Sequence, residues 1–238
     1  RSISAVQLQE DGSMSDVPFM ASLFAHDKPI LKEYPDKPYT KFERLLINSI
    51  SDALQKENIN SRDKKTVLII STTKGNISLL ETETYSKELE NRISLNTSAK
   101  LVADYFHFAN KPIVISNACI SGLLALITGM RLLQSGQYEN AVIAGADVIS
   151  KFVLSGFQSF QAISSDRCKP FDAARNGINL GEAAGTVVLS SNKKLDRGFQ
   201  LLSGSVSNDA NHISGPSRTG IELNMAITKV MKDANLSA

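Results

Sequence analysis

An uncharged run of 19 residues, Pro112 to Met130, constrains the fold of this chain more than any other feature. A membrane-spanning helix needs about 20 predominantly apolar residues, so the run approaches that length. However, it contains the polar pair Ser116-Asn117, and its opening, Pro-Ile-Val-Ile-Ser, is typical of a buried strand. Ser121 to Leu133 is apolar on nearly every side and precedes the helix-stop signal Ser135-Gly136. The run predicts a strand and a helix buried in the middle of a domain, without membrane insertion.

The rest of the chain alternates apolar strands with amphipathic helices. Helical spacing of apolar residues predicts helices over Tyr39 to Asn58, Ile77 to Arg92, Asn96 to Phe108 and Gly220 to Leu236. Short apolar runs predict strands over Lys65 to Thr72, Ile113 to Ile115, Asn140 to Val148, Thr186 to Leu189 and Leu201 to Val206. The run from Asn140 carries small residues, which indicate a close approach of another element. This alternation predicts an α/β layered fold.

Composition and cysteine content narrow the class of protein. With 42% hydrophobic residues, the chain has the composition of a folded globular protein and is not mainly disordered. The 26 Lys and Arg residues against 24 Asp and Glu residues leave a net charge of only +2, so the chain lacks the excess positive charge typical of a nucleic-acid-binding protein. Cys119 and Cys168 are the only cysteines, which excludes a disulfide scaffold and favours a reducing, cytoplasmic location. The chain begins at Arg1 without a signal pattern. We expect it to be part of a longer gene product.

Cys119 is the strongest candidate for a nucleophile. It lies between the strand ending at Ile115 and the helix beginning near Ser121. The positive end of a helix dipole favours thiolate, and unpaired N–H groups there can bind the oxyanion of a thioester under attack. On these features alone, a small buried cysteine at an element boundary is an equally good interpretation.

Ser116-Asn117-Ala118-Cys119-Ile120-Ser121-Gly122 resembles the nucleophile segment of the β-ketoacyl-acyl-carrier-protein synthases, condensing enzymes of the thiolase-like fold. Other segments are similar to landmarks of that family, in the same order and at matching spacing: Ala144-Gly145-Ala146-Asp147, Gly156-Phe157, Ala162-Ile163-Ser164, Lys169-Pro170-Phe171-Asp172, Arg175, Gly177, Gly181-Glu182-Ala183-Ala184-Gly185, Asp209-Ala210-Asn211-His212 and Gly215-Pro216. Ala183 stands where the family usually has glycine, a change that is tolerated unless the backbone there needs a positive φ.

The resemblance implies a thiolase-like α/β/α fold with a mixed, mainly parallel sheet. It implies that residues 1–238 are the N-terminal domain of a duplicated α-β-α-β-α architecture, and that Cys119 takes an acyl group from acyl carrier protein. In the intact synthase, malonyl carrier protein then loses CO2 and its carbanion attacks the acyl-Cys, giving a 3-oxoacyl product in fatty acid or polyketide and polyene synthesis. No cofactor is needed, and a homodimer is expected.

The family's catalytic histidines lie in His-Gly-Thr and Gly-His segments that this sequence does not contain. We therefore expect this chain to hold only the nucleophile half and to be inactive in condensation by itself. His26 and His107 are most simply structural, and the resemblance places His212 in a supporting loop. Three scattered histidines and two distant cysteines have no metal-ligand spacing.

Further residues have structural and functional interpretations. Asp172, Arg175 and Glu182 are expected to form a buried hydrogen-bonded brace under the site, because an arginine between two carboxylates makes such a brace. Phe157 and Phe160 are core residues or, as a weaker hypothesis, the wall of an acyl pocket. Cys168 is expected in an exposed turn.

Two other functions remain open. A non-catalytic partner subunit, similar to chain-length factors, would be expected to lack the cysteine. A Cys-dependent thioesterase would need a general base near Cys119, which the sequence does not place.

Overall fold

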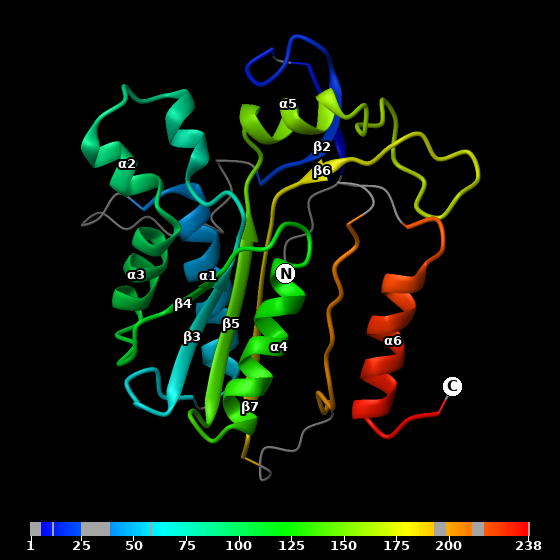
Figure 1. Ribbon diagram of the computed structural model, residues 1–238. Coiled ribbons are helices and arrows are strands. Elements are labelled where there is room, and N and C mark those ends of the chain that lie inside the picture. Colours follow the sequence, from blue (N-terminus) through cyan, green and yellow to red (C-terminus); the bar gives the residue numbers. More distant parts are fainter. Residues whose placement is uncertain are drawn as a thin grey trace.

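A four-stranded sheet forms the centre of the molecule (Figure 1). The computed structural model describes residues 6–10, 12–24, 39–57, 59–192, 199–210 and 217–237. The strands are β3 (Thr66–Ser71), β4 (Ile113–Ile115), β5 (Asn140–Asp147) and β7 (Ala183–Ser190), in the spatial order β4-β3-β5-β7. β3 is parallel to β4 and to β5, and β7 is antiparallel to β5. The sheet is therefore mixed and mainly parallel, as predicted.

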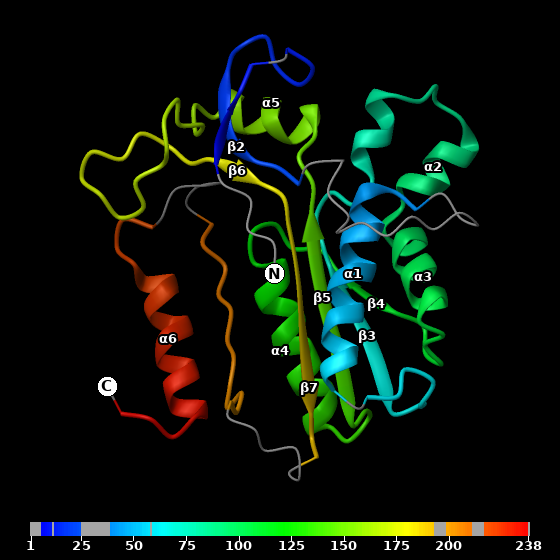
Figure 2. The ribbon, with the colours of Figure 1, turned by 180° about the vertical axis from the view of Figure 1, so that it is seen from behind.

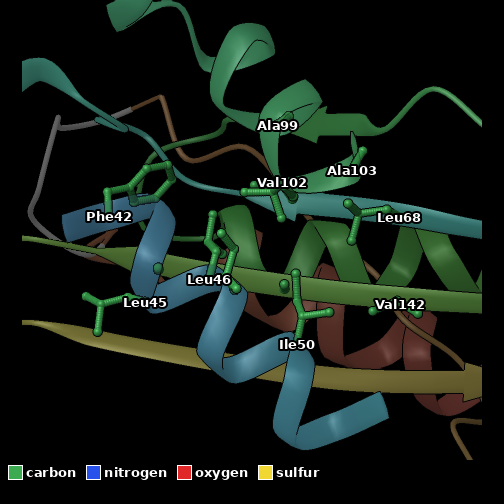
Figure 3. Close-up of a cluster of buried hydrophobic side chains, with 13 residues drawn as sticks. Phe42, Leu45, Leu46, Ile50, Leu68, Ala99, Val102, Ala103 and Val142 are labelled. Atoms are coloured by element: carbon green, nitrogen blue, oxygen red, sulfur yellow. The ribbon is translucent and has the colours of Figure 1, made fainter. Parts of the chain in front are cut away.

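Helices cover both faces of this sheet (Figures 1 and 2). Leu68 and Ile70 of β3 contribute to a core with α1 (Lys41–Lys56) and α3 (Leu95–Tyr105), which Figure 3 shows. Val67 and Ile69 belong instead to the cluster that contains Ala125 of α4 (Ser121–Gln134). Because successive side chains of a strand point to opposite faces, this division gives three layers, α/β/α.

Helix α1 begins at a capping box. The Thr40 hydroxyl accepts a hydrogen bond from the N–H of Glu43, and the Glu43 carboxylate accepts one from the N–H of Thr40. The arrangement satisfies two of the donors that a helix N-terminus leaves unpaired. The apolar side of the helix then packs on the sheet through Phe42, Leu46 and Ile50.

The helix predicted over Ile77 to Arg92 is interrupted. The structure has a 3₁₀ helix, η1 (Ile77–Glu81), and a separate helix, α2 (Lys87–Ile93). The hydroxyl of Ser86 accepts a hydrogen bond from the N–H of Leu89, so Ser86 starts a new helix instead of continuing the first.

A second sheet of three strands was not foreseen. It contains β1 (Gln7–Gln9), β2 (Phe19–Ser22) and β6 (Leu180–Gly181), in the order β1-β2-β6. It lies beside α5 (Lys151–Ser159), and Phe19 and Leu180 share a buried cluster with Leu154 of that helix. The sheet thereby joins the N-terminal segment to the residues directly before β7.

The last part of the described chain differs most from expectation. A strand was predicted over Leu201 to Val206, but residues 199–210 form none. Within the described part of the chain, no strand pairs with this segment. They run between α4 and α6 (Ile221–Asp233) in both views (Figures 1 and 2). No residue of α6 is buried. Helix α4 was predicted to be buried in the middle of the domain, but Leu123 is 50% exposed.

Candidate functional site

The carboxyl ends of the parallel strands β4, β3 and β5 meet at one edge of the central sheet. In open α/β sheets, this edge is where ligands bind. Three residues with reactive or hydrogen-bonding side chains follow or end these strands: Cys119 after β4, Thr72 after β3 and Asp147 at the end of β5. The edge is therefore the candidate site.

Cys119 lies in a tight turn between β4 and α4, as the sequence predicts, and it is exposed. The turn is closed by Ser121, whose hydroxyl accepts a hydrogen bond from the N–H of Asn117 at 2.8 Å and donates one to the carbonyl oxygen of Ala118 at 2.7 Å. Ala118 has a φ of 43°, which is unusual for a residue with a Cβ atom. The local hydrogen bonds therefore hold a strained backbone directly before the thiol.

Thr72 and Asp147 were not predicted as a pair. The Thr72 hydroxyl donates a hydrogen bond to Oδ1 of Asp147 at 3.1 Å, and the Thr72 N–H donates to the carbonyl oxygen of Ile115 at 3.2 Å. Asp147 is exposed as a whole residue, but the surrounding protein shields its carboxyl from part of the solvent. This desolvation raises the pKa of the Asp147 carboxyl, while the Thr72 hydrogen bond and the charge of Lys74 act in the opposite direction. No spacing in the sequence indicates this contact, because the two residues are 75 positions apart.

Glu182 is buried at the junction of the two sheets. Its Oε2 lies 2.6 Å from the ammonium of Lys41 and accepts a hydrogen bond from the N–H of Phe24 at 2.8 Å. Its Oε1 accepts from the N–H of Ile149 at 3.3 Å. The carboxylate therefore links α1, the end of β2 and the β5–α5 connection.

The predicted brace of Asp172, Arg175 and Glu182 needs correction. Asp172 and Arg175 are exposed, and among the described residues no ion pair joins Arg175 to either carboxylate. Arg175 donates to the backbone oxygen of Asp172 at 2.9 Å, and the Asp172 carboxylate accepts from the N–H of Ala174 at 2.7 Å. The two residues stabilise a local turn, whereas Glu182 takes Lys41 as its partner.

Besides Glu182, the structure contains a second buried carboxylate, Glu43, which was not predicted from the sequence. Glu43 is fully buried, is paired with Arg92 and accepts a hydrogen bond from Asn76 Nδ2 at 3.0 Å. Burial alone would raise the pKa of Glu43, but its hydrogen bonds from Arg92, Thr40 and Asn76 and the charge of Arg92 lower it overall. The Thr40-x-x-Glu43 capping box is the one signal in the sequence that could have pointed to this carboxylate.

The two aromatic candidates, Phe157 and Phe160, lie in different surroundings. Phe157 is partly buried and packs against the cluster of α5 and the small sheet, as the core interpretation has it. Phe160 follows the end of α5 and is 59% exposed.

The remaining candidates are Cys168 and the three histidines. Cys168 is partly buried, and its N–H donates to Asn179 Oδ1 at 2.8 Å. His107 is exposed after α3, whereas His26 and His212 lie outside the described residues. Ala183 has no positive φ, so its methyl group is tolerated. In the part of the chain that the structure describes, no cluster of potential metal ligands occurs, and no helix is long and apolar enough to cross a membrane.

Relatives with known names match the chain by sequence. It is 32% identical over 130 residues to Nodulation protein E of Rhizobium meliloti, covering 52% of this chain and 32% of the relative. It is 31% identical over 137 residues to 3-oxoacyl-[acyl-carrier-protein] synthase 2 of Vibrio harveyi, covering 52% and 33%. The chain thus matches about a third of the length of these relatives.

Solved structures match over more of the chain. The ishigamide ketosynthase/chain length factor superposes with a TM-score of 0.78 at 22% identity, covering 92% of this chain and 59% of that one. The ketosynthase ApeO in complex with its chain length factor ApeC, from Xenorhabdus doucetiae, gives a TM-score of 0.74 at 24% identity, covering 98% and 60%. These likenesses show the fold, which is the thiolase-like layered α/β fold of ketosynthases.

The family model described as "Beta-ketoacyl synthase, N-terminal domain" matches residues 12–194. That range contains the turn at Cys119, the buried carboxylates Glu43 and Glu182 with their ion-pair partners, and the whole central sheet. It ends before residues 199–210 and α6. By this match, the chain belongs to the β-ketoacyl synthase family.

Proposed function

We propose that this protein provides the nucleophile of a 3-oxoacyl-acyl-carrier-protein synthase, with Cys119 as the catalytic residue. The thiolate of Cys119 attacks the thioester carbonyl of acyl carrier protein, the carrier thiol leaves, and the acyl group is held as a thioester on Sγ. Condensation of this acyl group with malonyl carrier protein belongs to the whole synthase. The 238-residue chain supplies no histidine of the family's catalytic segments.

One observation supports this function more than any other: the exposed Cys119 lies in the turn between β4 of the central sheet and the N-terminus of the 14-residue helix α4. The helix dipole and the N–H groups of the first turn favour negative charge at that place. A thiolate and the oxyanion that forms when it attacks a thioester are both negative. The two stages of acyl transfer would thus be stabilised by the same element.

A homodimer is part of this proposal. β4 lies at the edge of the central sheet, and in the described residues its outer side pairs with no other strand. In the family that the sequence resembles, the strand before the nucleophile lies at the dimer interface. The unpaired edge of β4 is consistent with such an interface, since an edge strand left open invites pairing with another chain.

A non-catalytic partner subunit is the second candidate. The structures that superpose on this chain include ketosynthases together with their chain length factors, so the fold fits either role. The presence of Cys119 favours the catalytic role, because a partner subunit needs no nucleophile.

Acylation of the purified chain tests the proposal. The chain is incubated with octanoyl-acyl carrier protein and digested, and the Cys119 peptide is examined by mass spectrometry. We expect a stable octanoyl adduct on Cys119, absent from Cys119→Ala and unchanged in Cys168→Ala. No adduct on either cysteine would favour the partner subunit, and release of free octanoate without a lasting adduct would favour a thioesterase.

A further inference from the structure

Thr72 connects the ends of three strands at the candidate site. It directly follows β3 and is 3% exposed. Its N–H donates to Ile115, the last residue of β4, and its hydroxyl donates to Asp147, the last residue of β5. The hydroxyl oxygen also accepts from the N–H of Gly75 at 3.2 Å. A threonine hydroxyl has one proton, so the contact with Asp147 uses it fully.

We propose that Thr72, oriented by Asp147, is a positioning residue for the Cys119 thiol. The proposal rests on the acyl transfer proposed above. Ile115, whose carbonyl oxygen accepts from the Thr72 N–H, is only four positions from Cys119 in the sequence. On the other side of the turn, Ser121 holds Asn117 and Ala118. The turn is therefore fixed at two points, one on the sheet and one on the helix.

The backbone of the turn explains why two attachments are needed. A non-glycine residue in the left-handed region, such as Ala118 with its φ of 43°, costs about 1–3 kcal/mol and persists only when its surroundings hold it. If the attachment at Ile115 loosens, the turn can relax toward an ordinary conformation. Sγ of Cys119 would then move away from the start of α4. A displacement of about 1 Å in a reacting group can lower a rate about a hundredfold.

Asp147 determines where the Thr72 hydroxyl points. A hydroxyl can rotate toward any nearby acceptor, but a hydrogen bond to a carboxylate is roughly twice as strong as one between neutral groups. The contact also ties β5 to β3 beyond their last paired residues, Ser71 and Gly145. The three strand ends consequently form one unit under the turn.

The test uses alkylation of the two cysteines in the 238-residue chain. Iodoacetamide is the probe, and the rate at Cys119 is divided by the rate at Cys168 in the same molecule. We expect Thr72→Val and Asp147→Ala to lower this ratio by about threefold or more, because a displaced thiol loses the stabilisation of the helix N-terminus. Thr72→Ser keeps the hydroxyl and should stay within about twofold of the parent. Thr73→Val is the matched control and should leave the ratio unchanged.

The outcomes separate this inference from the proposed function. If the parent forms no acyl adduct, the proposed function fails, while the alkylation ratios still decide whether Thr72 positions the thiol. Parent-like ratios in Thr72→Val and Asp147→Ala would overturn the inference even where acyl transfer is observed. A ratio in Thr72→Ser as low as in Thr72→Val would also overturn it, because the methyl group and not the hydroxyl would then be responsible. If Thr72→Val does not fold, Asp147→Ala decides, since Asp147 is an exposed residue at the end of its strand.

Discussion

The ammonium of Lys41 lies 2.6 Å from Oε2 of Glu182, although 141 positions separate the two residues in the sequence. The Glu182 side chain is 3% exposed, and Lys41 stands at the start of α1. The pair therefore fixes the first turn of α1 to the short connection between β6 and β7. Glu182 itself lies where the two sheets meet, next to Ala183, which pairs with Asp147 at the carboxyl end of β5.

Removing the Glu182 carboxylate should destabilise the protein strongly. Glu182→Ala leaves the Lys41 ammonium and two backbone N–H groups without their acceptor, and breaking a buried pair in this way costs about 3–5 kcal/mol. Arg175→Ala is the contrasting variant, because Arg175 is exposed and contacts only its own turn. Its effect should stay within about 0.5 kcal/mol. Urea unfolding measures both, and equal losses in the two variants would contradict the assignment of Lys41 as the partner.

Acid should destabilise the protein partly through Glu43. The pKa of Glu43 is lowered in the folded protein, so its contribution is fully present above the unfolded-state value near 4.5 and is lost as the pH falls through the folded value. Glu43→Gln should be less stable than the parent at neutral pH and should lose less stability on acidification.

Unfolding by urea at a series of pH values from about 7 down to about 3 measures the effect of Glu43. Glu88→Gln is the control, because Glu88 is an exposed carboxylate on α2. Identical pH profiles for the parent and Glu43→Gln would show that another group is responsible.

Cys119 should react with iodoacetamide before Cys168. Cys119 is exposed directly before helix α4, whereas Cys168 is partly buried in the loop between α5 and β6. Exposure and the helix dipole both favour the first thiol. Peptide mapping over a time course measures the order, and the same experiment in urea should remove the difference. Earlier labelling of Cys168 in the folded protein would contradict the assignment of Cys119 as the reactive thiol.

The sequence predicted those parts of the fold that depend on local pattern. The strands β3 and β5 are buried on both faces, so each is a continuous apolar run that can be recognised by itself. Cys119 could be placed because its position requires only the strand before it and the helix after it. The segment over Leu201 to Val206 also has the pattern of a strand, but a strand forms only where another strand offers its N–H and C=O groups.

Contacts between distant segments could not be predicted in the same way. Glu182 was expected to pair with Arg175, seven residues earlier, because spacing shows only near neighbours. Its partner Lys41 is brought to it by the packing of α1 against β5 and β7. Strands β1 and β6 have three and two residues, too few to produce an alternating pattern.

Two glycines that face each other across β5 and β7 should respond oppositely to a methyl group. Gly145 pairs with Gly185, but a Cβ atom at Gly145 would lie 2.6 Å from Oγ of Ser71, whereas one at Gly185 would meet nothing within 4 Å. Gly145→Ala should therefore cost about 1–3 kcal/mol as an overpacked site. Gly185→Ala should be neutral or stabilise by up to about 1 kcal/mol, because alanine loses less backbone entropy on folding.

A double variant identifies the cause of the loss at Gly145. Adding Ser71→Ala to Gly145→Ala removes the oxygen that the new methyl group would contact, so the two changes should couple and most of the lost stability should return. Urea unfolding of the single and double variants gives the coupling energy. Additive losses would show that the backbone oxygen of Ser71, 3.3 Å from the same Cβ position, limits the space instead. Equal stabilities of Gly145→Ala and Gly185→Ala would contradict the close approach of β3 and β5 at this edge of the sheet.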